Sequence, residues 1–319
     1  MGKKIMKFVV GFLIGGLCIA LVFGGAHFFY SKEVGKKAKN TITSSVVSKK
    51  VTNTATKEIA KEETKDSKDA TSESSDESVS KLTNKTLEKD IEALNQSAGS
   101  VAYSIYFTGT DKEISNHNNE QMVSASVIKV FIMDYLYQQS VQGQLDLSEV
   151  TSGESLDSLI RRMIQSSDNE ATNSLIDYVG MDKLNQYFAS AGYTQTTVQR
   201  KMLDTNAQAQ GLENYTSLND TMTFLKKCLT YQTESPYSEM LTVMKGQQIN
   251  TKIRRLIPEG VQVANKTGEL GGVDNDIGII FSDHPVIISV LTNNGQSPET
   301  VRQAISQLSL DAYELSIDK

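Results

Sequence analysis

Cysteine and histidine are both scarce in this 319-residue sequence, which has two cysteines and three histidines. Cys18 falls in an apolar run near the N-terminus and Cys228 stands alone in the rest of the chain, so the folded part can form no internal disulfide. The histidines do not cluster with the cysteines or with carboxylates, and we therefore expect neither a metal site nor a bound cofactor. These histidines are His27, His117 and His284.

Positive charge is not in excess either. The formal net charge is −6, and the lysines and arginines form no basic stripe along the chain. Proteins that bind nucleic acids concentrate basic residues on one face, where they contact the phosphates. We therefore exclude nucleic acid as a partner.

Residues 8–30 are apolar apart from His27. At ~1.5 Å per residue, a helix of this length crosses the ~30 Å hydrocarbon core of a bilayer. The run is longer than the ~7–15 apolar residues of a signal peptide, so we expect an uncleaved single-pass anchor with residues 1–7 in the cytoplasm. A signal peptide cleaved near the small residues Gly24, Gly25 and Ala26 is the alternative.

Large apolar residues are almost absent from residues 31–85, which are rich in Ser, Thr, Lys and Glu. Such a segment cannot bury enough apolar surface to offset its ordering entropy, so we expect a disordered tether. A flexible chain of about 55 residues has a root-mean-square span on the order of 40 Å. Lysines lie on both sides of the preceding apolar run, so charge does not decide the orientation. We expect an extracellular domain because of the chemistry described below.

Residues 86–319 have the patterning of one folded domain. Apolar residues alternate from Val101 to Phe107, as in a half-buried strand, and helical periodicity dominates the middle of the chain. Further strands are predicted at 261–267, 276–282 and 286–292, and helices at 126–138, 156–165, 170–179, 182–191, 218–229, 238–245 and 298–315. This order predicts an α+β fold, in which helices from both chain ends flank an antiparallel sheet and an all-helical lobe is inserted.

Three short motifs carry the chemistry. In Ser126-Val127-Ile128-Lys129, the serine and the lysine lie one turn apart on the same face of a predicted helix. The same spacing occurs at 78–81 and 316–319, so it is weak evidence alone. Ser167-Asp168-Asn169 follows a predicted helix, and Lys266-Thr267-Gly268 ends a predicted strand.

These motifs occur together, in this order, in class A β-lactamases and penicillin-binding proteins. Over about 86–319 the chain resembles the class A β-lactamase family, including the stretches MIQSSDNEATNSLI and VANKTG. The resemblance implies the fold of that family and a serine hydrolase that acts on β-lactams or on cell-wall peptides of the D-Ala-D-Ala type.

A serine hydroxyl needs a neighbouring base to act as a nucleophile. A Ser-His-Asp triad with Ser126 would need His117 or His284, and neither lies in a recognisable motif. Lys129 can serve if it is neutral. Burial on an apolar helix and repulsion from Lys266 would both lower its pKa.

The resemblance also implies roles for the other motif residues. Ser167 would pass a proton to the leaving nitrogen, and Asn169 would bind the substrate amide. The backbone N–H groups of Ser126 and Glu269 would form the oxyanion hole.

A substrate carboxylate would be bound by Lys266 and Thr267, beside Gly268. Arg254 matches an arginine that some relatives use for the same purpose, and its planar guanidinium suits a carboxylate. A solvated surface arginine is the alternative for Arg254.

One position departs from the family pattern. Class A enzymes hydrolyse the acyl-enzyme with a glutamate in the motif arginine, any residue, glutamate. This chain has Met202 at the glutamate position, after Arg200 and Lys201. A thioether is no base, although Asp204 or Glu213 would be a substitute if the loop folds differently. We therefore expect that β-lactams acylate the protein and leave slowly.

The main alternative is a binding module that senses penicillin or cell-wall peptide without turnover. A structural surface protein that merely retains the motifs is a third hypothesis. In each case we expect a monomer at the cell membrane, with β-lactam or D-alanyl peptide as the partner.

Overall fold

The structure is a computed structural model that describes the backbone of residues 73–317 and the side chains of residues 85–317. The predicted anchor at 8–30 lies outside the described residues. Within 73–317, no helix has both the length and the apolar character required to cross a bilayer.

The first described element is α1, Glu73–Ser97. It begins inside the segment 31–85 for which we expected disorder, so the expected domain start at residue 86 lies within a helix. The C-terminal part of α1 packs Leu87 and Leu94 into the core. A helix nucleated by this packing extends upstream at little cost, because adding a residue to an existing helix is far easier than starting one.

A five-stranded antiparallel sheet forms the centre of the domain, with the strand order β2-β1-β9-β8-β7. The strands come from both ends of the described chain, as expected. Strand β2 was not predicted, because its short polar sequence resembles a turn. The strands are β1 Ala98–Phe107, β2 Lys112–Ser115, β7 Val263–Leu270, β8 Val273–Ile280 and β9 Val286–Gly295.

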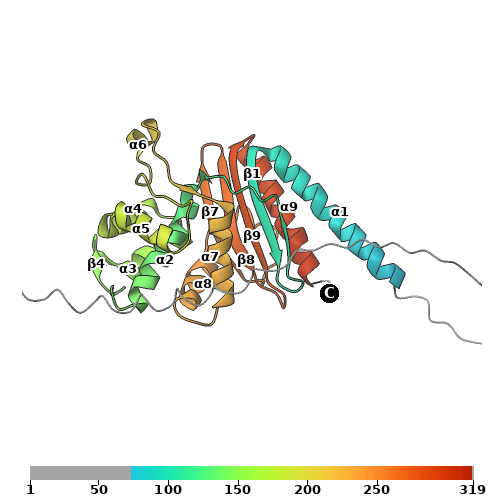
Figure 1. Cartoon of the computed structure of the whole chain (residues 1–319), viewed down its shortest axis with the longest axis horizontal. Coiled ribbons are helices and arrows are strands. Elements are labelled where there is room, and N and C mark those ends of the chain that lie inside the picture. The colour runs from blue at the N-terminus through green and yellow to red at the C-terminus, as the bar shows by residue number, and fades with distance from the viewer. Residues whose placement is uncertain (1–72, 318–319) are drawn as a thin grey trace, which may run out of the picture. The chain divides into compact units, whose positions relative to one another are not determined.

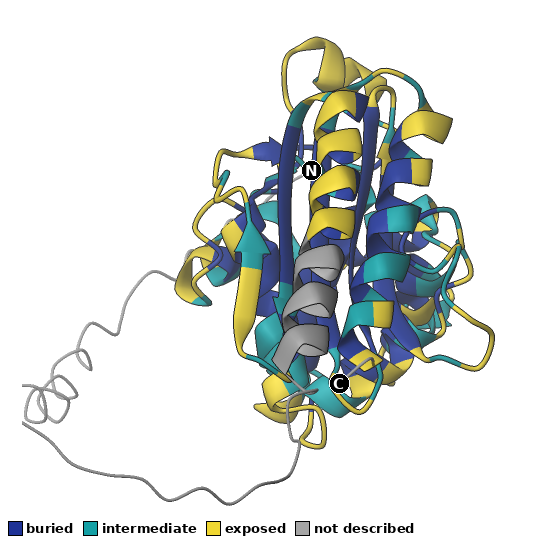
Figure 2. Cartoon of the chain, turned by 90° about the vertical axis from the view of Figure 1, so that its right-hand side faces the viewer, coloured by how far each residue is buried: buried dark blue, intermediate teal, exposed yellow. Residues whose placement is uncertain are grey.

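Helices cover both faces of this sheet (Figure 1). On one face α1 packs beside α9, Pro298–Ile317, and on the other lie α7, Leu218–Thr230, and α8, Tyr237–Lys245. Alternate residues of β9 therefore point into two separate cores: Val286 and Ile288 into the α1/α9 core, Ile287 and Leu291 into the other. Figure 2 shows the strands buried between these helices and an exposed stripe along α1.

The inserted lobe is helical and lies against the α7/α8 side of the sheet (Figure 1). It confirms the predicted α+β architecture. The predicted helix from 126 begins instead with a 3₁₀ turn, η1, and becomes α-helical at Ile128. The lobe's elements are η1 Ala125–Val127, α2 Ile128–Val141, α3 Leu156–Gln165, α4 Asn169–Val179, α5 Met181–Ser190 and α6 Thr205–Ala209. Four short strands form two further antiparallel pairs. Strand β3, Met122–Val123, pairs with β6, Tyr215–Thr216, and β4, Val150–Thr151, pairs with β5, Glu154–Ser155.

Candidate active site

Ser126 lies in the 3₁₀ turn η1 and lines a cleft together with Asn169, Met202 and Glu269. These residues come from η1, the start of α4, the loop before α6 and the end of β7. Ser126 is half-buried, so its hydroxyl is accessible from the cleft. The hydroxyl makes no hydrogen bond to another residue of the described chain.

The turn carrying Ser126 lies directly against edge strand β7. A Cβ atom added to Gly268 would lie 2.8 Å from the Ser124 carbonyl oxygen and 3.2 Å from the Ser126 nitrogen. Only glycine therefore allows this approach without displacing backbone. From β8, the Asn275 side chain donates hydrogen bonds to the carbonyls of Val123 (2.9 Å) and Ser124 (3.1 Å), which fixes the segment that leads into the turn.

The three motifs meet at the Ser167 hydroxyl. Lys129 Nζ lies 3.2 Å from Ser167 Oγ, and Lys266 Nζ lies 3.0 Å from the same oxygen. Lys129 also donates to the Ser167 carbonyl (2.8 Å) and to Asn169 Oδ1 (2.9 Å). Lys266 donates to the Thr267 carbonyl at 2.7 Å. The structure thus brings Lys129, Ser167 and Lys266 into one hydrogen-bonded chain.

Both lysines are fully buried, and neither has a carboxylate as a direct partner. Burial lowers the pKa of Lys129 to about 7, although the charge of Asp168 partly opposes the shift. The pKa of Lys266 is lowered well below its ordinary value, first by burial and then by the charge of Lys129. A hydroxyl between two such amines can donate its proton to one and accept from the other.

The turn that presents Ser167 is strained and firmly held. Ser167 has a positive φ of 57°, and Ala125, just before the nucleophile, has 45°. Non-glycine residues adopt this region at a cost and are concentrated at functional sites. Asp168 caps α4 by accepting from the Ala171 N–H at 2.9 Å, and Arg162 donates to the same carboxylate.

Met202 lines the cleft and is 8 % exposed. The Asn173 side chain, one turn beyond Asn169 on α4, forms hydrogen bonds with both backbone polar groups of Met202. It accepts from the Met202 N–H at 2.7 Å and donates to the Met202 carbonyl at 3.1 Å. The thioether thus occupies the cleft where the family pattern places a carboxylate.

The two proposed substitutes for that carboxylate are both engaged elsewhere. Asp204 is the N-cap of α6 and accepts from the Ala207 N–H at 2.9 Å. Glu213 pairs with Arg200 through two hydrogen bonds, of 2.8 and 3.0 Å, and also accepts from Gln208 and from the Asn214 N–H. Asp204 does not line the cleft, whereas Glu213 lines it as a member of this ion pair.

Arg254 does not line the cleft. Its half-buried guanidinium donates instead to the carbonyls of Lys245 (3.1 Å) and Val263, which joins α8 to β7. The structure therefore does not bring Arg254 into the lining of the cleft, and its role as a substrate ligand stays a prediction. Thr267 is buried and Gly268 is packed against η1, beside the cleft.

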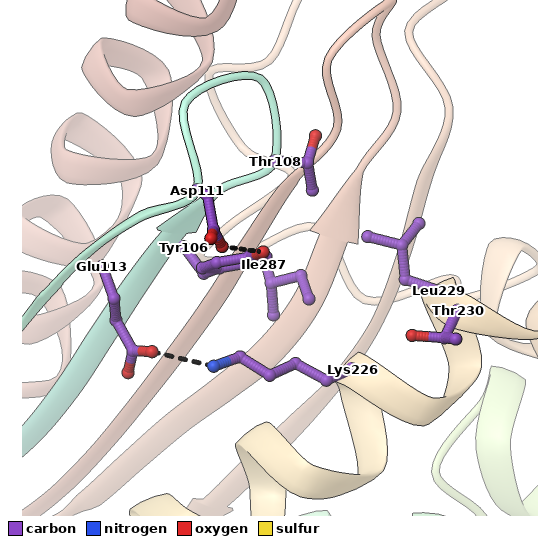
Figure 3. Close-up of a pocket in the computed structure, with 8 residues that line it drawn as sticks. All are labelled: Tyr106, Thr108, Asp111, Glu113, Lys226, Leu229, Thr230 and Ile287. Atoms are coloured by element: carbon purple, nitrogen blue, oxygen red, sulfur yellow. Dashed lines mark hydrogen bonds and ion pairs between the residues drawn. The ribbon is translucent and has the colours of Figure 1, made fainter.

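A larger pocket, of about 400 Å³, lies between β1, β2 and α7 (Figure 3). Its charged groups are paired, since the Tyr106 hydroxyl donates to Asp111 (2.7 Å) and Lys226 pairs with Glu113 (2.8 Å). It contains no serine, cysteine or histidine, so the smaller cleft at Ser126 remains the candidate site. Neither His117 nor His284 lines that cleft. Among the described residues, no group of three or more potential metal ligands comes together.

Sequence reasoning missed two kinds of functional residue. Asn173 and Asn275 position Met202 and the Ser126 turn, but an asparagine inside a helix or strand carries no signal of its contacts. The second kind is the ion-pair network around the Glu269 side chain, whose cations Lys252 and Arg302 lie far from it in sequence. The sequence assigned Glu269 only through its backbone N–H.

Comparison with known proteins agrees with this geometry. A model described as "Beta-lactamase enzyme family" matches residues 85–315. The extended-spectrum β-lactamase PER-1 of Pseudomonas aeruginosa is 25 % identical over 237 residues, covering 63 % of this chain and 77 % of that protein. An imipenem-hydrolysing β-lactamase of Enterobacter cloacae is 26 % identical over 218 residues, covering 59 % and 75 %. A solved β-lactamase structure from Sphaerobacter thermophilus superimposes with a TM-score of 0.65 at 26 % identity, covering 73 % of this chain and 97 % of that one.

Proposed function

The chain belongs to the β-lactamase enzyme family of serine hydrolases, and we propose that Ser126 forms an acyl-enzyme with β-lactams or with cell-wall peptides of the D-Ala-D-Ala type. The observation that carries the proposal is the contact of Lys129 and Lys266 with one hydroxyl, that of Ser167, beside the cleft that contains Ser126. The printed names of the relatives support β-lactams as the first substrates to test.

In the acylation step, Ser126 Oγ attacks the β-lactam carbonyl carbon and its proton passes to neutral Lys129. The backbone N–H groups of Ser126 and Glu269 stabilise the oxyanion. The C–N bond of the ring then breaks, and Ser167 returns the proton to the ring nitrogen from the lysine pair. No atom is lost, so the adduct has the mass of the protein plus the whole β-lactam.

Deacylation is proposed to be slow. It needs a water and a base on the Met202 side of the cleft. Two carboxylates line the cleft within the described chain, Glu213 and Glu269, and both are ion-paired. With a thioether at position 202 in place of a carboxylate, we infer that the ester on Ser126 persists.

The test is intact-mass kinetics on the full chain with benzylpenicillin. We expect rapid gain of one penicillin mass that persists long after free penicillin is removed, and no gain in Ser126→Ala. Return to the free mass at the rate of an efficient β-lactamase would contradict slow deacylation. Absence of any adduct would contradict the acyl-enzyme itself.

A non-hydrolytic binding module is the second candidate, because the Ser126 hydroxyl makes no hydrogen bond to either lysine in this structure. It requires peptide or penicillin to bind without adduct formation, which calorimetry on the same sample would detect. In either case we propose a monomer anchored by residues 8–30, with the domain outside the membrane. This is supported by the length of the apolar run and by the extracellular location of cell-wall peptide.

A further inference from the structure

Glu269 immediately follows the Lys266-Thr267-Gly268 motif, and its side chain lines the cleft that contains Ser126. The side chain is 37 % exposed, whereas the six preceding residues of β7 are buried. A carboxylate therefore lies at the cleft surface, close to the position where a bound acyl donor would contact the end of the strand.

Two cations hold this carboxylate from behind. Lys252, which is fully buried, donates to Glu269 Oε1 at 2.7 Å, and Arg302 of α9 pairs with Oε2 at 3.1 Å. The Thr251 hydroxyl also donates to Oε1, at 3.1 Å. Burial opposes ionisation of Glu269, but these hydrogen bonds and charges prevail and lower its pKa, so the group is ionised at neutral pH.

The cleft has no other cation to offer an anionic donor. Arg200 is the one cationic residue in its lining, and its guanidinium is bound to Glu213 and to the Lys201 carbonyl. Arg254 is bound to backbone carbonyls away from the cleft. Lys252 and Arg302 do not line the cleft, and each pairs with both Glu269 and Asp274.

We propose that the Glu269 side chain selects the substrate by charge, favouring acyl donors that are uncharged next to the scissile bond. The inference rests on the proposed acyl-enzyme function. Glu269 and Asp274 together occupy Lys252 and Arg302, and the exposed Glu269 carboxylate repels a donor carboxylate that enters the cleft. An anionic donor can bind only by displacing Glu269 or by accepting a like charge beside it, whereas a neutral ester or amide meets neither obstacle.

The experiment compares two probes that differ by one charge, benzylpenicillin and its methyl ester. Second-order acylation rate constants are measured by intact mass on the full chain, for the wild type and for Glu269→Gln. Glutamine retains a carbonyl oxygen to accept from Lys252 and removes only the charge. We expect the variant to acylate about tenfold faster with benzylpenicillin and to change less than about twofold with the ester.

Glu299→Gln is the matched control. Glu299 also pairs with an arginine, Arg255, at 2.9 Å, but it lies at the start of α9 outside the cleft lining. The substitution Glu299→Gln removes the same charge from the protein and should leave the ratio of the benzylpenicillin and methyl ester acylation rates unchanged.

The wild type alone gives a second measurement that does not depend on a variant folding. Screening of a like-charge repulsion should raise its benzylpenicillin rate as salt increases, while the ester rate stays constant. An unchanged ratio in Glu269→Gln, an equal gain with both probes, or a salt-independent penicillin rate would overturn the inference. Absence of adduct with both probes in every protein would instead contradict the proposed function.

Discussion

The two sides of the cleft are both held by hydrogen bonds but differ in chemistry. The β7 side has the proposed nucleophile, Ser126, and two buried amines of lowered pKa, Lys129 and Lys266, which share the Ser167 hydroxyl. On the opposite side, the loop through Met202 is held by the Asn173 hydrogen bonds and by the ion pair between Arg200 and Glu213. The loop is held in place, but a thioether stands at the position where the family pattern has a carboxylate. This comparison supports our proposal that acylation and deacylation are separated by one side chain in this site.

Removing the proposed base, Lys129, is the largest disruption of the acylating side. Lys129→Ala should slow penicillin acylation by about 10³-fold, because general-base catalysis typically contributes on the order of 10²–10⁴. Intact mass gives the rate, and circular dichroism confirms the fold. Lys226→Ala, which removes a lysine paired with Glu113 in the other pocket, should retain the wild-type rate. A loss of less than tenfold in Lys129→Ala would exclude Lys129 as the base.

Adding a base to the other side should produce the next largest effect. In Met202→Glu, a carboxylate enters the cleft on a backbone that Asn173 already fixes, so we expect deacylation of the penicillin adduct to accelerate about 10²-fold. Met202→Gln is the control, since glutamine has a similar size but no basic oxygen of comparable strength. If the two variants deacylate equally fast, the missing carboxylate is not what limits turnover.

Much of this site was predictable because each motif combines with a local structural signal. The spacing of Ser126 and Lys129 predicts a shared helical face, and apolar residues predict a strand at Lys266, although Ser126 lies in a 3₁₀ turn and β7 continues to Leu270. Their convergence on Ser167 followed from the family resemblance. The lowered pKa of Lys129 followed from the apolar residues around it on the same helix, which predict burial.

What was not predictable depends on contacts between residues distant in sequence. The guanidinium of Arg254 is suited to bind a carboxylate, but in the structure it is oriented by its hydrogen bonds to the carbonyls of Lys245 and Val263. The position of the Glu269 side chain is fixed by its ion pairs with Lys252 and with Arg302 of α9. The start of α1 before residue 86 follows from a helix nucleated by the packing of Leu87 and Leu94, which local composition does not reveal.

The pH dependence of acylation sharpens the comparison without mutation. Burial lowers the pKa of Lys129 to about 7, and the neutral amine is the reactive form. The acylation rate should therefore level off above pH 7 and fall about tenfold per pH unit below it. The pKa of Asp90 is also raised to about 7, by burial and by Asp311. Asp90→Asn should retain the same profile, and a wild-type rate independent of pH from 5 to 8 would contradict a neutral lysine base.

The smallest predicted effect tests the close approach of β7 to the nucleophile. In Gly268→Ala, the new methyl group would meet backbone atoms of Ser124, Ser126 and Val127 at 2.8–3.2 Å, so the turn and the strand must separate. Overpacking of this kind costs about 1–3 kcal/mol of stability. The separation also moves the N–H groups of Ser126 and Glu269 apart, so acylation should fall several-fold, to about tenfold.

Gly271→Ala makes the same chemical change three residues further along, where nothing lies within 4 Å of the added Cβ atom. It should retain both the thermal midpoint and the acylation rate. Because the Met202 loop is untouched in either variant, the lifetime of the adduct once formed should change little. A Gly268→Ala protein that acylates normally would mean that the contact between β7 and η1 does not set the geometry of the oxyanion hole. A shortened adduct lifetime would mean that the two sides of the cleft are coupled through β7.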